Sequence, residues 1–195
     1  IRNGEYLNKY QLKKKYPNIK NFFLVVFHPI TEEFNKLQIY IKNLCEALDS
    51  FQEQKVWILP NNDAGSTIIK ENILKYKNSE SIYFRNLSRF DYLGFLNACK
   101  ILVGNSSSGI IESPSFNKIS INIGNRQIER IQSKLTINCD YSTNNIKKSI
   151  IKGVNKKIKK VKVYPYGDGK SSQRILEVLN STNLGDNFLV KKITY

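Results

Sequence analysis

The chain has 195 residues, 41% of them hydrophobic, which is enough for one substantial core and within the usual size of a single domain. Its 31 Lys and Arg outnumber 16 Asp and Glu, and the formal charge of +15 favours an anionic partner such as a nucleotide, nucleic acid or a membrane surface. No apolar run reaches the roughly 18 residues of a membrane span and the amino terminus is polar, so we expect neither a membrane protein nor a signal peptide.

The cysteines argue for a reducing compartment. Cys45, Cys99 and Cys139 are odd in number, widely spaced and set among apolar residues, without the Cys-x-x-Cys spacing of zinc or redox sites. We expect buried, reduced thiols in a cytoplasmic protein. The sequence contains no methionine and begins at Ile1, so we expect a piece of a larger protein.

In the first half of the chain, short β-branched runs alternate with longer amphipathic stretches, which is typical of βα units around a parallel sheet. The pattern predicts a strand at 22–27, a helix at 31–50, a strand at 55–59, a helix at 66–76 and a strand at 82–84. In the helix at 31–50, apolar residues recur at spacings of three and four: Phe34, Leu37, Ile41, Leu44 and Leu48.

The second half continues the alternation. We predict a helix at 88–99 that Ser88 and Asp91 open with a variant of the capping box, and a strand at 101–103. A short helix should follow Asn105 and end near Pro114, which fits poorly inside a long helix. Strands at 118–123 and 135–139 and helices at 143–155 and 170–179 complete an α/β fold, a Rossmann-like parallel sheet flanked by helices. The lysine-rich stretch at 147–162 is interpreted as a solvated helix face and loop.

Open parallel sheets bind ligands where their strands end, so function is expected in the loops that follow strands. Four such loops carry polar residues: His28-Pro29, Pro60-Asn61-Asn62-Asp63-Ala64-Gly65, Gly104-Asn105-Ser106-Ser107-Ser108-Gly109 and Gly124-Asn125-Arg126-Gln127.

The loop from Gly104 to Gly109 joins a buried strand to a helix start, and its small residues allow backbone N–H groups to approach a pyrophosphate. Glu112 lies further along, about 7–8 Å away if the stretch is helical, which matches the reach from a diphosphate to a ribose diol. The alternative is that Ser106 or Ser107 is only a helix cap and Glu112 only a surface acid.

Other loops add candidates whose structural interpretations also stay open. Arg126 would brace phosphates if its strand neighbours the serine loop, or would be an ordinary surface arginine. His28, the one histidine of the sequence, would face phosphate or transfer a proton, or be structural. Asn61 and Asp63 are interpreted first as turn residues that could also face a ligand. A metal site is not expected, since no second histidine and no chelating cysteine pair exist.

Taken together, these loops resemble the UDP-N-acetylglucosamine 2-epimerases, and within them the hydrolysing branch of sialic acid and nonulosonate synthesis. The His-Pro-x-Thr form of the first motif is similar to that branch, whereas non-hydrolysing relatives carry His-Arg-Arg-Glu-Asn. The matching motifs stand in family order from about residue 20 to about residue 180: Phe27-His28-Pro29-Ile30-Thr31, Pro60-Asn61-Asn62-Asp63-Ala64-Gly65-Ser66, the segment from Val103 to Glu112, Asn122-Ile123-Gly124-Asn125-Arg126-Gln127 and Tyr164-Pro165-Tyr166-Gly167-Asp168-Gly169-Lys170.

The resemblance implies the carboxyl-terminal half of a glycosyltransferase B-type fold, in which two Rossmann-like domains close over a nucleotide sugar. Residues 1–20 would lead in from the missing first domain, 21–182 would bind UDP and 183–195 would form a tail. The implied site uses Ser106, Ser107 and Arg126 for the diphosphate, Glu112 for the ribose and Leu87 for main-chain contact with uracil. His28 as a catalytic residue and Asn61 as a binding residue would line the same pocket.

The implied reaction eliminates UDP from UDP-N-acetylglucosamine or a related sugar and adds water to give the 2-epimeric free sugar, without a cofactor or metal. The proton-moving carboxylates would belong to the missing domain, and the full enzyme would be a homo-oligomer that binds neither nucleic acid nor membrane. Two positions depart from the family: Glu129 replaces a common glycine, and Thr67 replaces a lysine that binds a feedback inhibitor in the animal branch. Two alternatives are a UDP-sugar glycosyltransferase and, from the charge, a nucleic-acid-binding domain.

Overall fold

The computed structural model describes residues 4–76, 80–158 and 166–182. The chain divides into two compact units, one up to residue 165 and a second from residue 166, and each is described by itself.

The first unit is built on one sheet of six parallel strands in the order β3-β2-β1-β4-β5-β6. The order reverses between β1 and β4, and in open parallel sheets the carboxyl edge at such a point is where ligands bind. This confirms the predicted Rossmann-like α/β fold. The strands are β1 (Phe22–Val26), β2 (Gln54–Ile58), β3 (Ile82–Phe84), β4 (Leu102–Gly104), β5 (Ser120–Ile123) and β6 (Thr136–Cys139).

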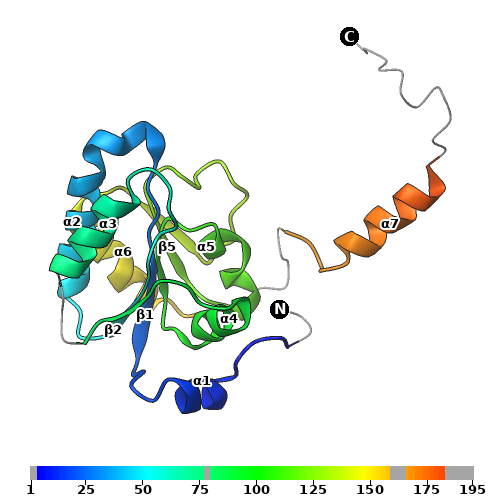
Figure 1. Cartoon of the computed structure of the whole chain (residues 1–195), viewed down its shortest axis with the longest axis horizontal. Coiled ribbons are helices and arrows are strands. Elements are labelled where there is room, and N and C mark those ends of the chain that lie inside the picture. The colour runs from blue at the N-terminus through cyan, green and yellow to red at the C-terminus, as the bar shows by residue number, and fades with distance from the viewer. Residues whose placement is uncertain (1–3, 77–79, 159–165, 183–195) are drawn as a thin grey trace, which may run out of the picture. The chain divides into compact units, whose positions relative to one another are not determined.

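Helices cover both faces of the sheet (Figure 1). One face carries α2 (Leu37–Asp49), α3 (Ser66–Lys75) and α6 (Thr143–Asn155), and the other carries α1 (Lys9–Lys15), α4 (Arg89–Ala98) and α5 (Ser108–Ile111). Alternate residues of β1 enter the two cores, because Phe23 and Val25 pack with α2 while Leu24 and Val26 pack with α4. Both faces of the strand are therefore buried, as its unbroken apolar run predicts.

The predicted helix at 31–50 is wrong at its start. A 3₁₀ helix (Thr31–Lys36) precedes α2, and Glu33 inside it has a non-helical backbone, at φ −113° and ψ 20°. Glu33 Oε2 accepts a hydrogen bond of 2.7 Å from the Tyr141 hydroxyl, so a contact distant in sequence accompanies the break. As a result Phe34, which the spacing assigned to the apolar face, is 44% exposed.

Helix α1 was not predicted, yet it is part of the first unit. Leu7 and Leu12 are buried in the same core as Phe22 and α4. Lys15 Nζ lies 2.8 Å from both carboxylate oxygens of Asp91. The predicted capping box of α4 is therefore only half formed, because Ser88 Oγ accepts from the Asp91 N–H but the Asp91 carboxylate binds Lys15 instead.

Most remaining elements lie within two residues of their predicted positions.

The three cysteines are all free thiols, with Cys45 and Cys99 buried and Cys139 half-buried. The lysines at the end of α6 are exposed, as expected. Among the described residues, the helices are all too short or too polar to cross a membrane.

The second unit contains α7 (Ser171–Ser181), which matches the final predicted helix. Before it, Asp168 forms a two-pronged ion pair with Arg174, with both contacts at 2.7 Å. The expectations for Tyr164 and Pro165, for lysines at 159–162 and for the tail at 183–195 lie outside the described residues.

Candidate functional site

The ends of β1 and β4 are joined by one side chain at the point where the strand order reverses. The His28 N–H donates to Asn105 Oδ1 at 2.7 Å, and Asn105 Nδ2 donates to the His28 carbonyl at 2.8 Å. Asn105 is completely buried, so these bonds are shielded from water. Gly104 permits the approach, since its φ is 137° and a Cβ there would lie 1.9 Å from the Val26 carbonyl oxygen.

The loop after β5 reaches the same point. Arg126 Nη1 and Gln127 Nε2 both donate to the Asn105 carbonyl, at 3.1 and 3.0 Å. Gln127 is buried, whereas the Arg126 side chain is exposed and keeps further N–H donors for a ligand. The pKa of Arg126 is lowered from its usual value by burial and by the positive charge of Arg130, whereas the negative charge of Asp63 acts in the opposite direction. The hydrogen bond to Asn105 therefore holds the Arg126 guanidinium beside the serine loop.

The serine loop turns directly into α5, a helix of only four residues, as the position of Pro114 predicts. Ser106 Oγ accepts from the Ser108 N–H at 3.3 Å, while Ser107 occupies the cap position without a side-chain cap bond. A capping role therefore explains the Ser106 hydroxyl, but it does not explain the Ser107 hydroxyl, which makes no cap hydrogen bond. The hydroxyl of Ser108 is buried with no hydrogen-bond partner among the described residues.

Glu112 ends α5 and faces the start of α4. Its Oε1 accepts a hydrogen bond of 2.9 Å from Arg89 Nη1, and the two side chains are 17% and 70% exposed. The pair leaves Glu112 Oε2 available, and a mostly exposed arginine exchanges partners at little cost. Glu112 is therefore not an isolated surface acid, since it pairs with Arg89. The pair can open at little cost because Arg89 is mostly exposed.

His28 is half-buried just beyond the carboxyl end of β1. Burial lowers its pKa, and the neighbouring charge of Arg126 lowers it further, against the opposing effect of Asp63. The lowered pKa favours the neutral imidazole near pH 7.

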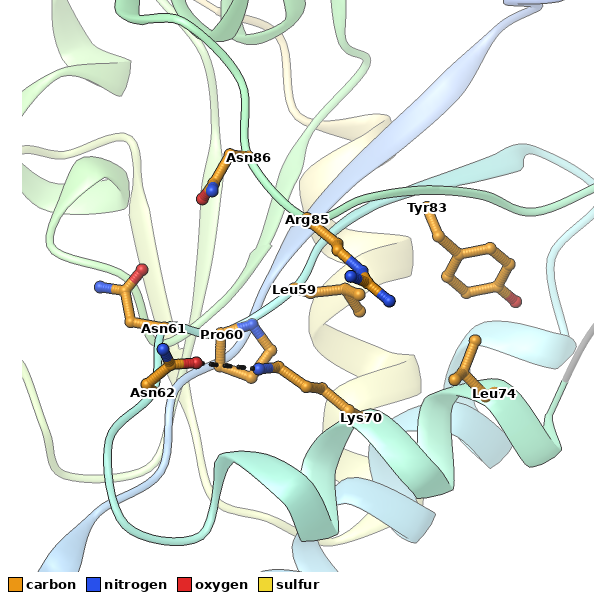
Figure 2. Close-up of a pocket in the computed structure, with 9 residues that line it drawn as sticks. All are labelled: Leu59, Pro60, Asn61, Asn62, Lys70, Leu74, Tyr83, Arg85 and Asn86. Atoms are coloured by element: carbon orange, nitrogen blue, oxygen red, sulfur yellow. Dashed lines mark hydrogen bonds between the residues drawn. The ribbon is translucent and has the colours of Figure 1, made fainter.

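Asn61 and the residue before Leu87 line one cavity of about 730 Å³ at the ends of β2 and β3 (Figure 2). Lys70 of α3 donates to Asn62 Oδ1 at 3.4 Å across the cavity floor, and Arg85 supplies a second cation. Leu87 itself is half-buried against the core around α4 and is not among the residues that line the cavity.

The structure thus brings four predicted residues or motifs to one edge of the sheet. His28, Arg126 and the serines meet through Asn105, and Glu112 caps the end of α5. Asn61 instead lines a neighbouring cavity together with Asn86, the residue before Leu87. Asn105 and Gln127 were not predicted as site residues; the one signal in the sequence is that the Asn105 amide directly follows a buried strand. In the described part of the chain, no group of three His, Cys, Asp or Glu residues is suited to a metal ion.

Comparison with known proteins agrees with this picture. A sequence model of the UDP-N-acetylglucosamine 2-epimerase family matches residues 3–180. A UDP-N-acetylglucosamine 2-epimerase of Neisseria meningitidis is 35% identical over 165 residues, which cover 83% of this chain and 44% of that protein. A hydrolysing UDP-N,N'-diacetylbacillosamine 2-epimerase of Legionella pneumophila is 32% identical over 178 residues, covering 90% of this chain and 47% of the relative.

Solved structures share the fold. The UDP-GlcNAc 2-epimerase of Methanocaldococcus jannaschii, crystallised with UDP-GlcNAc and UDP, superposes with a TM-score of 0.69 at 15% identity, over 92% of this chain and 50% of that one. A Staphylococcus aureus MnaA–UDP complex gives 0.66 at 18% identity, over 90% and 48%.

The fold is a Rossmann-like domain of the glycosyltransferase B type, and its strand-end loops carry cationic and amide side chains. The chain belongs to the UDP-N-acetylglucosamine 2-epimerase family. It spans less than half the length of these two curated relatives.

Proposed function

We propose that this chain is the UDP-binding part of a hydrolysing 2-epimerase that acts on UDP-N-acetylglucosamine or a closely related UDP-amino sugar. Its enzyme eliminates UDP across C1 and C2 of the sugar and adds water, releasing the 2-epimeric free sugar. The part described here grips the departing diphosphate and the nucleoside.

One observation carries the proposal: the Asn105 junction holds His28, the serine loop and Arg126 together at the switch point of the sheet. A diphosphate there receives backbone N–H and hydroxyl donors from the loop and a guanidinium fork from Arg126. Glu112, at the far end of the four-residue helix, is placed to accept from the two ribose hydroxyls by exchanging its bond to Arg89.

Elimination needs a base at C2 and stabilisation of the negative charge that develops on the leaving phosphate. Ser106, Ser107, Arg126 and His28 supply the stabilisation, with His28 as the residue that meets the phosphate as a proton donor. Carboxylates for the proton at C2 come from the other half of the enzyme. Asn61 and the Leu87 main chain bind the sugar nucleotide from the neighbouring cavity. We further propose residues 21–182 as the UDP-binding domain of a cytoplasmic homo-oligomer.

The hydrolysing outcome is supported by the His28-Pro29-Ile30-Thr31 form of the first motif and by the name of the Legionella relative. Because the Neisseria relative is named without that qualifier, product analysis has to separate the two reactions.

Calorimetric titration of the chain with UDP tests binding. We expect saturable binding that Arg126→Ala weakens by about tenfold or more, the cost of a charge-assisted hydrogen bond. A folded protein that gives no binding heat with millimolar UDP would refute the proposal. With the full-length enzyme, formation of a free 2-epimeric sugar in the absence of any acceptor supports hydrolysis, whereas a requirement for an acceptor identifies a glycosyltransferase.

A further inference from the structure

The loop between β5 and β6, which carries Arg126, is closed by hydrogen bonds that the proposed binding site does not use. The Arg130 N–H donates to the Gln127 carbonyl at 3.2 Å. Gln132 Nε2 donates to the same carbonyl at 3.0 Å. One carbonyl oxygen thus accepts from a backbone group and from a side chain, which fixes the loop backbone directly after Arg126.

Gln132 is itself anchored to the sheet. Its Oε1 accepts a hydrogen bond of 2.8 Å from Asn138 Nδ2, and Asn138 Oδ1 accepts one of 2.8 Å from Asn122 Nδ2. Asn122 and Asn138 are register partners on β5 and β6, and Asn122 is 2% exposed. Gln132 therefore ties the far side of the loop to the carboxyl ends of these two strands.

On its near side the loop reaches the junction at Asn105. Gln127 Nε2 donates to the Asn105 carbonyl at 3.0 Å, and Arg126 Nη1 donates to the same oxygen at 3.1 Å. Gln127 is 2% exposed, so its bond is shielded from water. From Asn105 through Gln127, Gln132 and Asn138, hydrogen bonds run without a gap to β6, and we call this series the amide chain.

The direction of the Arg126 side chain depends on the backbone that carries it. Arg126 is exposed, so its long side chain loses rotamer freedom when it binds a ligand. A backbone that is already held in the binding shape lowers the total cost of ordering, and this raises affinity. Because Gln127 is the next residue, a bond to the Gln127 carbonyl restrains the backbone one residue away from Arg126.

We propose that Gln132 is a positioning residue for Arg126, because its hydrogen bond to the Gln127 carbonyl holds the loop in the shape that presents the guanidinium to a diphosphate. This inference rests on the proposed function, in which Arg126 braces the diphosphate of UDP. Gln132 acts through the loop backbone rather than by contact with the nucleotide. The amide chain supplies the two fixed points, β6 and Asn105, between which the loop is held.

A role for Gln132 in stability alone makes a different prediction. Gln132→Ala would then lower the free energy of unfolding but leave the UDP affinity of the folded chain unchanged. If Gln132 positions Arg126, the loss of affinity depends on the presence of the Arg126 side chain. A double-mutant cycle between the two residues measures this dependence.

Calorimetric titration with UDP of the wild type, Gln132→Ala, Arg126→Ala and the double variant completes the cycle. We expect Gln132→Ala to weaken UDP binding about threefold to tenfold, the effect of one lost hydrogen bond. The same substitution should cause no further weakening in Arg126→Ala. It should keep its full effect in Glu112→Gln, because Glu112 is assigned to the ribose.

Asn145→Ala is the matched control, since it removes an amide hydrogen bond of 2.8 Å to Asp140 at the start of α6, outside the amide chain. It should leave UDP binding unchanged. Urea unfolding establishes that each variant is folded. Asn138→Ala removes the outer anchor of Gln132 at an exposed strand position, and it serves as the second variant if Gln132→Ala does not fold. We expect it to weaken UDP binding in the same direction but by a smaller factor.

The outcomes separate this inference from the function on which it rests. A folded wild type that binds no UDP refutes the proposed function. A wild type that binds UDP with an affinity that neither Gln132→Ala nor Asn138→Ala changes overturns this inference alone. So does a loss of affinity of equal size with and without the Arg126 side chain.

Discussion

The Asn105 side chain ties the ends of β1 and β4 together through paired hydrogen bonds to the backbone of His28, at 2.7 and 2.8 Å. The amide acts like one more rung of the sheet, placed where the strands diverge. The backbone carbonyl of Asn105 accepts hydrogen bonds from Arg126 and Gln127, so a single buried residue aligns three loops.

Asn105→Ala should lower the free energy of unfolding by about 2–3 kcal/mol, since it removes two bonds and leaves buried backbone groups unpaired. It should also weaken UDP binding, because the His28 segment loses its tie to the serine loop, while the bond from Arg126 to the Asn105 backbone carbonyl is kept. Urea unfolding and calorimetry check both effects. Asn72→Ala, which removes one amide bond to Ile68 within α3, is the control and should have a smaller effect on stability and none on UDP. Equal effects of the two substitutions would contradict the role given to Asn105.

Gly104→Ala should prevent stable folding, because a Cβ would overlap the Val26 carbonyl oxygen at 1.9 Å and the backbone would be strained at φ 137°. Gly4→Ala separates the two causes, since Gly4 also has a positive φ, of 72°, but no atom within 4 Å of the added Cβ. Circular dichroism and thermal unfolding should show that Gly4→Ala lowers the free energy of unfolding by about 1–2 kcal/mol. A stable Gly104→Ala protein would mean that β1 and β4 are further apart than described.

Glu112→Gln should weaken UDP binding by about tenfold, because a charged acceptor for the ribose hydroxyls is lost. Binding of inorganic pyrophosphate, which has no ribose, should not weaken. Competition between the two ligands, measured by calorimetry, checks the assignment. Glu112→Ala should likewise weaken UDP binding more than His28→Ala does. If Glu112→Gln weakens both ligands equally, the carboxylate supports the loop and does not hold the ribose.

His28 should make the fold less stable in mild acid. Its pKa in the folded chain is lowered from the usual 6.5, so the unfolded chain binds more protons in the interval below 6.5. This contribution to stability is fully present above pH 6.5 and is lost as the pH falls through 6.5 towards the lower folded value. Urea unfolding between pH 5 and 8 should show the loss in the wild type and a flatter profile in His28→Gln. Identical profiles would show that the imidazole is not desolvated.

Leu12→Ala should lower the free energy of unfolding by about 2–4 kcal/mol, because Leu12 is only 2% exposed. Tyr10→Ala should lower it little, because Tyr10 is 77% exposed. Chemical unfolding of both variants checks whether α1 belongs to the first unit. A neutral Leu12→Ala would instead support a lead-in that contributes nothing to the core.

The sequence predicts β1 well because this strand is buried on both faces and therefore appears as an unbroken apolar run. It also locates β2 within one residue, although β2 begins with the buried polar residues Gln54 and Lys55. It misses α1, since Leu7 and Leu12 stand among lysines and show no long apolar period. It also misses the break at Glu33, which accompanies a contact with Tyr141 more than 100 residues away.

At the site, the sequence predicts which loops matter but not how their side chains pair. Ser106, Arg126 and Glu112 are recognisable because small, cationic and acidic residues follow strands at regular places. The bond between Glu112 and Arg89 depends on how α4 and α5 lie against each other, and spacing along the chain contains no information about it. For the same reason Asn105, one polar residue in a polar loop, does not stand out until its burial is known.

A crystal structure of the chain with UDP tests the central claim most directly. The account predicts the diphosphate within hydrogen-bond distance of the Ser106–Ser107 loop and Arg126, with the ribose hydroxyls on Glu112. UDP bound elsewhere on a correctly folded chain, with the Asn105 junction and Arg126 untouched, would contradict it.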